Sequence, residues 1–353
     1  MTQDAPLRSA IQQLSQGLPL TAEEAAGAFD VVMRGDATPV QIAALLMGLR
    51  AKGETADEVA GAANALRCAM VRFDGPGGEG LVDTCGTGGG RVGTLNISTA
   101  AAFVVAGAGV PVAKHGNRSY TSRSGSADVL EALGVDIAIA PARAAAVLRE
   151  AGLVFLFAPT YHPAMRHVAP VRKELGVATI MNLLGPLANP AGVRRQVIGV
   201  AAEDRGPLVA GALARLGAVH ALVVHAAVGM DEVSPSGETR VWEVRDGAVT
   251  RWEMSPHALG LTCADLDDLA GGEPEENARR VERLFEGQGA QVERCAVLLN
   301  AAAALYVSGR GWTMAEAAER ARESLDSGAA ARVLAALREA APAGKAQVLG
   351  RES

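Results

Sequence analysis

Residues 82–99 read VDTCGTGGGRVGTLNIST, a glycine-rich stretch between two apolar segments. The apolar pair ahead of it is typical of the end of a strand, and five glycines then fall within the eight residues from Gly86 to Gly93. Glycine lacks a Cβ, so this backbone can turn at positive φ and approach a ligand closely. Small hydroxyl and amide residues follow, and the apolar run after them predicts a buried helix. Exposed N–H groups beside a helix N-terminus bind anions, so the stretch favours a phosphate cradle.

The spacing of these glycines matches neither of two common nucleotide-binding loops. The segment Gly86-x-Gly88-x-x-Arg91 lacks the third glycine of a dinucleotide fingerprint, and Lys-Ser/Thr does not follow at Walker A spacing. A glycine-rich turn that lets a helix pack tightly on a sheet remains the alternative, because glycine content alone does not separate the two.

The composition is typical of a folded, mildly acidic protein. A chain of 353 residues allows about two domains. Hydrophobic residues make up 49% and charged residues 20%, which supplies a sizeable core and argues against disorder. The net charge of −6 argues against nucleic acid as the main partner, and 3% aromatic residues leave few stacking platforms for single strands.

The four cysteines indicate a reducing compartment. They show no CxxC spacing and no accompanying histidine cluster, so free thiols fit better than disulfides or a zinc site. Cys85, beside the glycine loop, is expected to be a small buried residue rather than a nucleophile. The polar N-terminus shows no signal-peptide pattern, and the longest apolar stretch, residues 100–113, is too short to span a bilayer. We therefore expect a cytoplasmic protein without membrane contact.

Residues 1–72 are predicted to form helices only. Three helix starts carry a capping box, in which a hydroxyl residue is followed three positions later by Glu or Gln. Ile42, Leu45, Leu46 and Leu49 form an apolar stripe at helical spacing, which must be buried. A packed helical subdomain is the expected result, and an oligomer interface is the alternative. The three capping pairs are Thr21 with Glu24, Thr38 with Gln41, and Thr55 with Glu58.

After a linker at residues 75–78, strand and helix patterns alternate, which indicates an α/β core with a mixed sheet. The Asp246-Gly247 pair between two strand patterns is typical of a hairpin turn. From Glu273 onward the chain is expected to be helical. Strands are predicted at 81–83, 110–113, 153–157, 196–201, 218–225, 239–245 and 248–253, and helices at 98–108, 126–133 and 141–151.

The run Lys114-His115-Gly116-Asn117-Arg118 follows a predicted strand, so its side chains should emerge at a carboxyl end of the sheet, where ligands bind in open α/β sheets. Two cations, an imidazole and an amide around a glycine suit an anionic phosphosugar. A solvated polar loop is the alternative, and the strand ahead favours a site. Further hydroxyl donors follow at Ser119, Thr121, Ser122, Ser124 and Ser126.

Adjacent carboxylates follow another predicted strand, at Asp231 and Glu232. Such a pair can hold Mg²⁺ together with waters and substrate phosphates, and a surface turn is the alternative. Arg172, near a predicted helix start at Pro170, could grip a carboxylate in a bidentate fork or pair with Glu174 on an exposed face. His162 could move protons or cap a turn. The segment 182–190 is interpreted as a helix end and a rigid loop without chemistry.

Taken together, these stretches resemble the anthranilate phosphoribosyltransferase family. The matching segments occur in the family's order and run from the N-terminal helices to the C-terminal part of the chain. KHGNRS and NLLGPLANP are the most specific of them. The segments are GTGG at 86–89, NIST at 96–99, KHGNRS at 114–119, SGSADVLEALG at 124–134, VRKELG at 171–176, NLLGPLANP at 182–190 and MDEVSP at 230–235.

The resemblance implies a small N-terminal α-helical domain and a larger α/β domain with a mixed, mainly parallel sheet. The helical domain would comprise residues 1–74, completed by about 168–190, and the α/β domain residues 75–167 and 191–353. The implied reaction transfers the phosphoribosyl group of phosphoribosyl pyrophosphate (PRPP) to anthranilate, with Mg²⁺, in a homodimer formed through the helical domain.

Family roles are carried over to matching positions. Ser98, Asp231 and Glu232 would ligate Mg²⁺, and Gly86, Asn117 and Arg172 would contact anthranilate. No covalent nucleophile is needed, and His115 and His162 are candidates for an optional base. The residues implied to bind PRPP are Gly86, Gly89, Gly90, Thr94, Asn96, Ile97, Ser98, Thr99, Lys114, His115, Gly116, Asn117, Arg118, Ser119 and Ser126.

The chain departs from the family pattern at two places. Gly90 and Arg91 stand where the family usually has Asp after GTGG, which removes a carboxylate and adds a cation, so we expect altered Mg²⁺ dependence or PRPP affinity. Tyr120-Thr121 replaces smaller residues after KHGNR. A pyrimidine nucleoside phosphorylase and a non-catalytic, nucleic-acid-binding relative are the alternatives. The two motifs named above disfavour the first, and the net charge disfavours the second.

Overall fold

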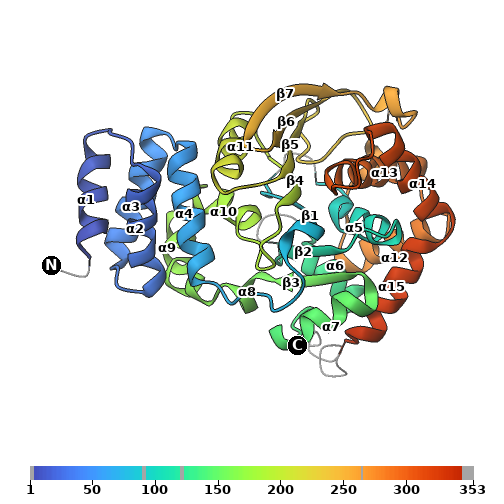
Figure 1. The fold of residues 1–353 in the computed structure, drawn as a ribbon, viewed down its shortest axis with the longest axis horizontal. Coiled ribbons are helices and arrows are strands. Elements are labelled where there is room, and N and C mark those ends of the chain that lie inside the picture. Colours follow the sequence, from blue (N-terminus) through green and yellow to red (C-terminus); the bar gives the residue numbers. More distant parts are fainter. Residues whose placement is uncertain (1–3, 90–92, 120–122, 264, 344–353) are drawn as a thin grey trace.

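The computed structural model describes residues 4–89, 93–119, 123–263 and 265–343. Four N-terminal helices stand side by side at one end of the molecule (Figure 1). All three predicted capping boxes are confirmed, at the starts of α2, α3 and α4. Gly35, with φ 82°, ends α2, and Gly53, with φ 90°, ends α3, as glycine allows. The four helices are α1 (Ala5–Ser15), α2 (Ala22–Arg34), α3 (Pro39–Lys52) and α4 (Ala56–Ala69).

A seven-stranded sheet forms the centre of the molecule, in the order β3-β2-β1-β4-β5-β6-β7. The strands from β3 to β5 are parallel and the last two are antiparallel, which confirms the mixed, mainly parallel sheet. Asp246 (φ 49°) and Gly247 (φ 82°) make the predicted hairpin turn. The strands are β1 (Val82–Gly86), β2 (Val112–Gly116), β3 (Leu153–Phe157), β4 (Arg195–Gly199), β5 (His220–Ala226), β6 (Thr239–Arg245) and β7 (Ala248–Met254).

The ends of two predicted strands were placed too early. Parallel pairing extends β1 to Gly86, opposite Gly199 of β4, and extends β2 to Gly116, opposite Phe157 of β3. Hydrogen bonds to a neighbouring strand therefore override the local polarity of the chain. As a consequence, Lys114 and His115 belong to a buried strand rather than to the loop after it.

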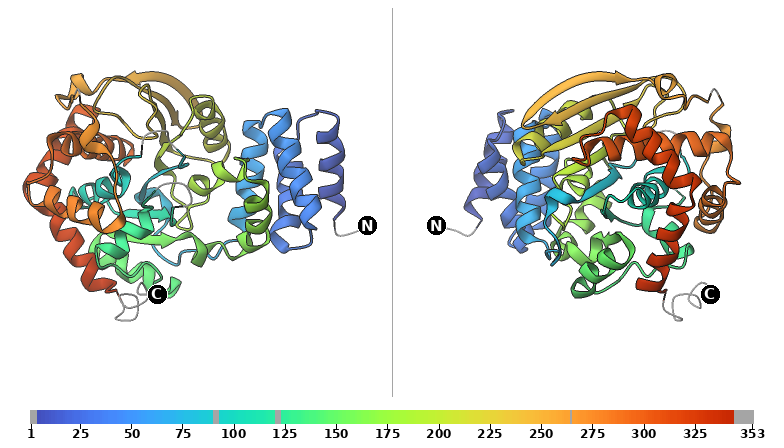
Figure 2. Two further views of the ribbon diagram at one scale, coloured as in Figure 1. Left: turned by 180° about the vertical axis from the view of Figure 1, so that it is seen from behind. Right: turned by 45° about the vertical axis from the view of Figure 1, so that its right-hand side comes forward.

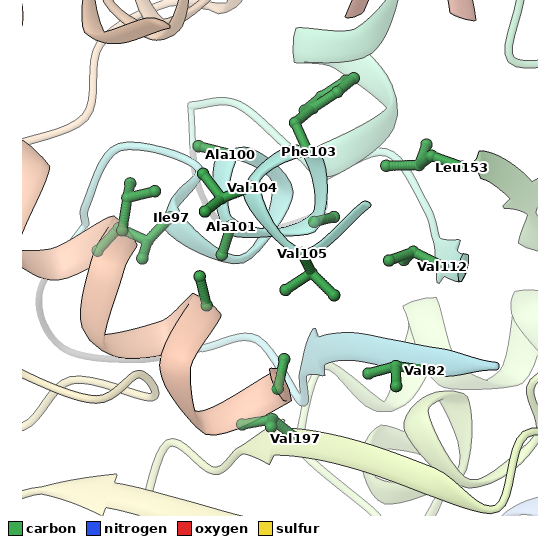
Figure 3. Close-up of a cluster of buried hydrophobic side chains, with 14 of the residues drawn as sticks. Val82, Ile97, Ala100, Ala101, Phe103, Val104, Val105, Val112, Leu153 and Val197 are labelled. Carbon is green, nitrogen blue, oxygen red and sulfur yellow. The ribbon is translucent and has the colours of Figure 1, made fainter. Parts of the chain in front are cut away.

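Helices cover both faces of the sheet (Figures 1 and 2). Helix α5 is apolar on nearly all sides and lies in the main core with Val82, Val112 and Leu153 (Figure 3). The helices after β1 are α5 (Ile97–Gly107), α6 (Ser126–Ala132), α7 (Pro141–Ala151), α8 (Ala158–Tyr161), α9 (Ala169–Leu175), α10 (Met181–Leu187), α11 (Arg205–Arg215), α12 (Pro274–Phe285), α13 (Gln291–Val307), α14 (Met314–Asp326) and α15 (Ala329–Ala340). The described residues also form the short 3₁₀ helices η1 (Gly78–Gly80), η2 (Pro163–His167), η3 (Pro256–Leu259) and η4 (Asp267–Leu269).

The second hydrophobic cluster joins the N-terminal helices to the other face of the sheet. Adjacent residues of β4 point to opposite faces, so Val197 packs in the α5 cluster and Ile198 in the second one. The predicted apolar stripe of α3 lies in this second cluster, as do Val171 of α9 and Leu184 of α10. The helical bundle is thus continuous with the core under the sheet.

The order of the strands positions the functional site. From β1 the chain proceeds to β2 and β3 on one side, and β4 and β5 lie on the other side. Ligands of open α/β sheets bind outside the carboxyl ends of the strands at such a reversal. Here that point lies between Gly86 of β1 and Gly199 of β4, where the glycine-rich loop begins.

Candidate active site

Two glycines at the ends of β1 and β4 admit the loop that carries Asp231. A Cβ on Gly199 would lie 1.6 Å from the backbone oxygen of Asp231, and one on Gly86 would lie 3.1 Å from its Oδ2. The first distance is incompatible with any side chain. Gly199 was not among the residues that sequence reasoning selected, because its need for glycine arises from contact with a distant loop of the chain.

Lys114 is the central charge of the site and is only 2% exposed. Its Nζ donates to the Thr84 carbonyl and lies 3.3 Å from Oγ of Ser98. Burial lowers the pKa of Lys114, while Asp83 and Glu232 oppose that shift. The ammonium group therefore lies between β1, β2 and the start of α5.

Asp83 is a buried carboxylate that sequence reasoning missed. It accepts hydrogen bonds from the His115 backbone N–H at 3.3 Å and from Nδ2 of Asn189 at 2.8 Å. Burial raises its pKa, and Lys114 is the largest opposing influence. The 182–190 segment, interpreted above as without chemistry, thus supports the site through Asn189. Only the folded chain brings Asn189 to Asp83, 106 residues away in sequence.

The adjacent carboxylates Asp231 and Glu232 lie close to Lys114 and Ser98. The pKa of Glu232 rises to about 8, because burial and then the charge of Asp231 disfavour its ionised form, while Lys114 and hydrogen bonds from Ser98 oppose the rise. Burial also raises the pKa of Asp231. A nearby cation would favour both ionised forms.

Asp231, Glu232 and Ser98 are suitable ligands for a Mg²⁺ ion that binds together with phosphate groups. Within the described ranges, no group of three or more His, Cys, Asp and Glu side chains surrounds a common metal position. Mg²⁺ usually takes one or two carboxylates and completes its shell with waters and substrate phosphates. Asp231, Glu232 and the Ser98 hydroxyl meet that description.

The start of α5 is held by a segment from the C-terminal half. The Leu95 N–H donates to the Leu269 carbonyl at 2.8 Å, and the Gly271 N–H donates to the Gly93 carbonyl at 3.0 Å. The side chain of Ile97 is fully buried and that of Thr99 nearly so, which leaves Ser98 half-exposed between them. Gly89 has a φ of 82° in the preceding loop. Gly90, Arg91, Tyr120, Thr121 and Ser122 lie outside the described residues.

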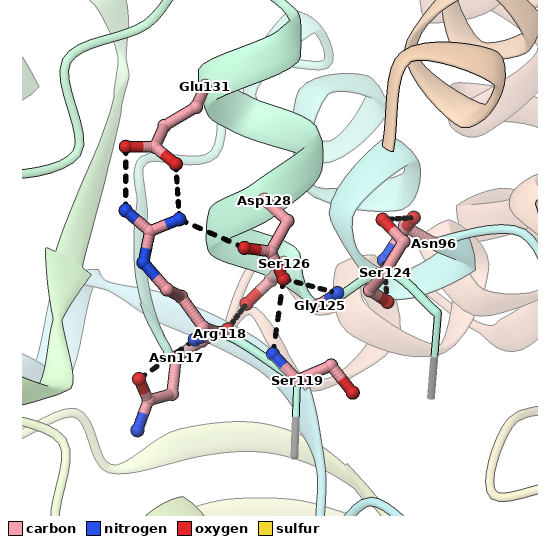
Figure 4. Close-up of polar contacts among 9 residues, drawn as sticks. All are labelled: Asn96, Asn117, Arg118, Ser119, Ser124, Gly125, Ser126, Asp128 and Glu131. Carbon is pink, nitrogen blue, oxygen red and sulfur yellow. Dashed lines mark hydrogen bonds and ion pairs between the residues drawn. The ribbon is translucent and has the colours of Figure 1, made fainter. Parts of the chain in front are cut away.

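The segment after β2 forms a second wall (Figure 4). Arg118 pairs with Glu131 through both terminal nitrogens and with Asp128 at 3.0 Å. Asp128 also accepts the backbone N–H of Ser119 at 3.2 Å. The structure therefore gives Arg118 a bracing role within its own loop.

Asn117 and Ser126 are brought together in the same wall (Figure 4), since the Ser126 hydroxyl donates to the Asn117 carbonyl at 3.3 Å. A Cβ on Gly116 would lie 2.3 Å from Oγ of Ser126, so glycine permits this approach. Arg172 comes from a different part of the fold, half-buried on α9.

His115 and His162 form a buried pair with ring centroids 5.0 Å apart. Burial lowers the pKa of His115 to about 3 and that of His162 to about 4. Nδ1 of His115 lies 3.1 Å from the Gly185 carbonyl. Both rings are neutral at pH 7, and both are weak bases.

Comparison with known proteins places the chain in a class. The family described as "Glycosyl transferase family, a/b domain" matches residues 78–331, and its helical bundle domain matches residues 8–70. The chain is thus a glycosyl transferase of the type that joins a helical bundle to an α/β domain.

Similarity to curated relatives narrows that class to one family. The chain is 50% identical to anthranilate phosphoribosyltransferase of Rhodopseudomonas palustris (strain BisB18), over 92% of this chain and 95% of the relative. It is 51% identical to that of Thermomicrobium roseum, over 91% and 93%. The chain belongs to the anthranilate phosphoribosyltransferase family, as the motifs predicted.

Two solved structures share the fold. The Thermus thermophilus enzyme has a TM-score of 0.86 and 45% identity, covering 93% of this chain and 99% of its own. The Saccharomyces cerevisiae enzyme in complex with PRPP and Mg also has a TM-score of 0.86, at 29% identity, covering 96% and 98%.

Proposed function

We propose that this protein transfers the phosphoribosyl group of PRPP to anthranilate, giving N-(5-phosphoribosyl)anthranilate and pyrophosphate. This reaction is the second step of tryptophan biosynthesis from chorismate. One observation carries the proposal: a glycine loop, a buried lysine and a carboxylate pair converge on the strand reversal of a family-typical fold. These groups suit a sugar substrate that carries a pyrophosphate.

The PRPP site comprises the glycine loop, the start of α5 and the end of β2. Because the apolar side chain of Ile97 is buried, only the backbone of this residue is available to contact PRPP. Lys114 supplies positive charge to the site. The proposed contacts are Gly86, Gly89, Gly90, Thr94, Asn96, Ile97, Ser98, Thr99, Lys114, His115, Gly116, Asn117, Arg118, Ser119 and Ser126.

Ser98, Asp231 and Glu232 would hold Mg²⁺. A Mg²⁺ ion held there would supply positive charge to offset the negative charge that the departing pyrophosphate gains. N–H groups of a glycine loop and of a helix start would stabilise the same developing charge, as such donors do at anion sites.

In the reaction, the amine nitrogen of anthranilate forms a bond to C1 of the ribose as the bond from C1 to the pyrophosphate oxygen breaks. The amine then loses a proton. Asn117, Arg172 and Gly86 position anthranilate, Arg172 by pairing with its carboxylate. No covalent nucleophile is needed, and burial holds the pKa of the Cys85 thiol well above its usual value. The low pKa values of His115 and His162 make a general base a minor contributor.

The division into residues 1–74 with about 168–190, and 75–167 with 191–353, is part of the proposal. Its helical part is supported by the packing of Val171 and Leu184 with the N-terminal helices in the second hydrophobic cluster, which also extends onto one face of the sheet. We also propose a homodimer formed through the helical domain. Among the described residues, no helix is long and apolar enough to cross a membrane. A cytoplasmic location is proposed on the four free cysteines.

The test follows the loss of anthranilate fluorescence with protein, PRPP and Mg²⁺. We expect turnover that stops when Mg²⁺ is chelated. Arg172→Ala should raise the KM of anthranilate about tenfold or more by removing a charge-assisted pair, with a small change in the KM of PRPP. Lys173→Ala, the exposed neighbour on α9, is the matched control. Absence of turnover by a folded protein would refute the activity, and an effect of Arg172→Ala confined to PRPP would refute its role.

A further inference from the structure

Asn277 of α12 is a buried amide outside the residues assigned so far. It is 1% exposed, and it lies 181 positions from Asn96 in sequence. Its Oδ1 accepts the backbone N–H of Gly272 at 2.9 Å. Its Nδ2 lies 3.0 Å from Oδ1 of Asn96 and 3.3 Å from the Gly272 carbonyl.

These contacts determine the orientation of both amides without ambiguity. A backbone N–H can only donate, so the atom of Asn277 that faces the Gly272 N–H is its oxygen. The other end of Asn277 is therefore the NH₂ group, and the atom of Asn96 that it faces must be the Asn96 oxygen. The backbone at Gly272 thus favours, through Asn277, one orientation of the Asn96 side chain, the one that the Ser124 carbonyl also requires.

The remaining contacts of Asn96 agree with that orientation (Figure 4). Its Oδ1 also receives the Ser124 hydroxyl at 3.3 Å, and its Nδ2 donates to the Ser124 carbonyl at 3.1 Å. In the described part of the chain, the second N–H of that Nδ2 has no partner. Asn96 is half-buried immediately before α5, and its side chain makes no capping hydrogen bond to that helix.

We propose that Asn277 is a positioning residue that holds Asn96 as a donor toward an acceptor oxygen of PRPP, a phosphate or ribose oxygen. The inference rests on the proposed function, which places Asn96 in the PRPP site. Without Asn277, among the described residues only the Ser124 carbonyl still requires the NH₂ group of Asn96, so the amide is held less firmly and can turn to present its carbonyl oxygen, which repels the oxygens of the substrate.

The primary variant is Asn277→Leu, which keeps the approximate shape and removes the donor. Asn277→Asp is the second variant, because it keeps an acceptor for Gly272 and places an oxygen opposite that of Asn96. Asn64→Leu and Asn64→Asp, on an exposed face of α4, are the matched controls. Titration calorimetry with PRPP and Mg²⁺, without anthranilate, measures binding, and thermal unfolding confirms that each variant is folded.

We expect both Asn277 variants to weaken PRPP binding about tenfold or more, the size of one lost hydrogen bond to a charged group. The KM of PRPP should rise in parallel, and that of anthranilate should stay within about twofold of the wild-type value. The Asn64 controls should match the wild type. If only one Asn277 variant folds, that variant carries the test.

A double-mutant cycle separates positioning from general structure. If Asn277 acts through Asn96, Asn277→Leu should change PRPP affinity by less than about twofold in an Asn96→Ala background. An equal loss in both backgrounds overturns the inference, as does unchanged PRPP binding by folded Asn277 variants. If the wild-type protein itself does not bind PRPP, the proposed function and this inference both fail. If it binds PRPP and turns over anthranilate while the cycle is additive, only the inference fails.

Discussion

The imidazole of His162 is neutral in the folded protein and ionises readily once the chain unfolds. Burial lowers its folded pKa to about 4, against the ordinary value of 6.5. The unfolded state therefore binds more protons at pH values between these two, so stability falls as the pH drops below about 6.5. This residue should make the protein sensitive to acid.

For His162→Gln, we expect a weaker dependence of stability on pH. Between pH 7 and pH 5, the wild-type protein should lose about 2 kcal/mol more of its free energy of unfolding than the variant does. Urea unfolding at both pH values measures the difference, and His257→Gln, on an exposed residue, serves as the control. Equal losses in the wild type and in His162→Gln would show that this imidazole is not buried as a neutral group.

At the scale of elements, the ends of β1 and β4 set the position of the Asp231 loop. Gly199→Ala places a Cβ 1.6 Å from the Asp231 backbone oxygen, so the loop must move. We expect about a hundredfold loss in kcat/KM for PRPP, because displacement by about 1 Å of the carboxylate proposed to hold Mg²⁺ would disrupt the geometry of the transition state.

Two other glycine-to-alanine variants calibrate the effect of Gly199→Ala. At Gly86 the added Cβ would lie 3.1 Å from Oδ2 of Asp231, so we expect a smaller loss. At Gly27, on α2, the nearest atom would lie at 3.5 Å, an ordinary contact, and activity should not change. Steady-state kinetics at several Mg²⁺ concentrations would contradict this account if Gly199→Ala behaved like Gly27→Ala.

The capping boxes of α2 and α4 have the same motif and unequal energetic roles. Glu24 serves the start of its own helix on the surface. Glu58 is fully buried and accepts the N–H groups of Thr55 and Leu20, each at 2.8 Å, and the ammonium of Lys52 at 3.0 Å. The capping box of α4 therefore also connects the start of that helix to the segment before α2 and to the end of α3.

We expect Glu58→Ala to lower the free energy of unfolding by about 3 kcal/mol, because a buried ammonium and two backbone donors lose their acceptor. Glu24→Ala removes an exposed cap and should cost distinctly less. Urea denaturation at pH 7 compares the two. Similar losses would mean that the long-range contacts of Glu58 add nothing to its capping role.

At the scale of the whole molecule, the outer face of α3 bears on the proposed homodimer. Val40 and Met47 are seven residues apart on one helix face and are 78% and 37% exposed. Apolar residues on an outward helix face fit an interface with a second copy of the bundle.

The double variant Val40→Glu/Met47→Glu should therefore shift the protein from dimer to monomer, measured by size-exclusion chromatography with light scattering. Val249→Glu, on β7, introduces the same side chain at an exposed apolar site and should remain a dimer. A Val40/Met47 variant that stays dimeric would place the interface elsewhere.

Local patterns in the sequence were sufficient for much of the fold. The capping boxes, the hairpin at Asp246-Gly247 and the alternation of strands and helices depend on neighbours within a few residues, and the structure confirms them. The ends of β1 and β2 could not be predicted from the local sequence, because pairing with β4 and β3 determines where these strands end. The motifs were also sufficient to predict the family, which the comparisons confirm.

By itself, then, the sequence determined the classes of helix and strand, the residue types of the site and the family. Only the tertiary structure decided that Lys114 is buried, that Asp83 meets Asn189, that Gly199 must lack a side chain and that Asn277 orients Asn96. The physical reason is that burial and hydrogen-bond orientation are properties of contacts between segments far apart in the chain. Such contacts leave no periodic trace in either segment alone.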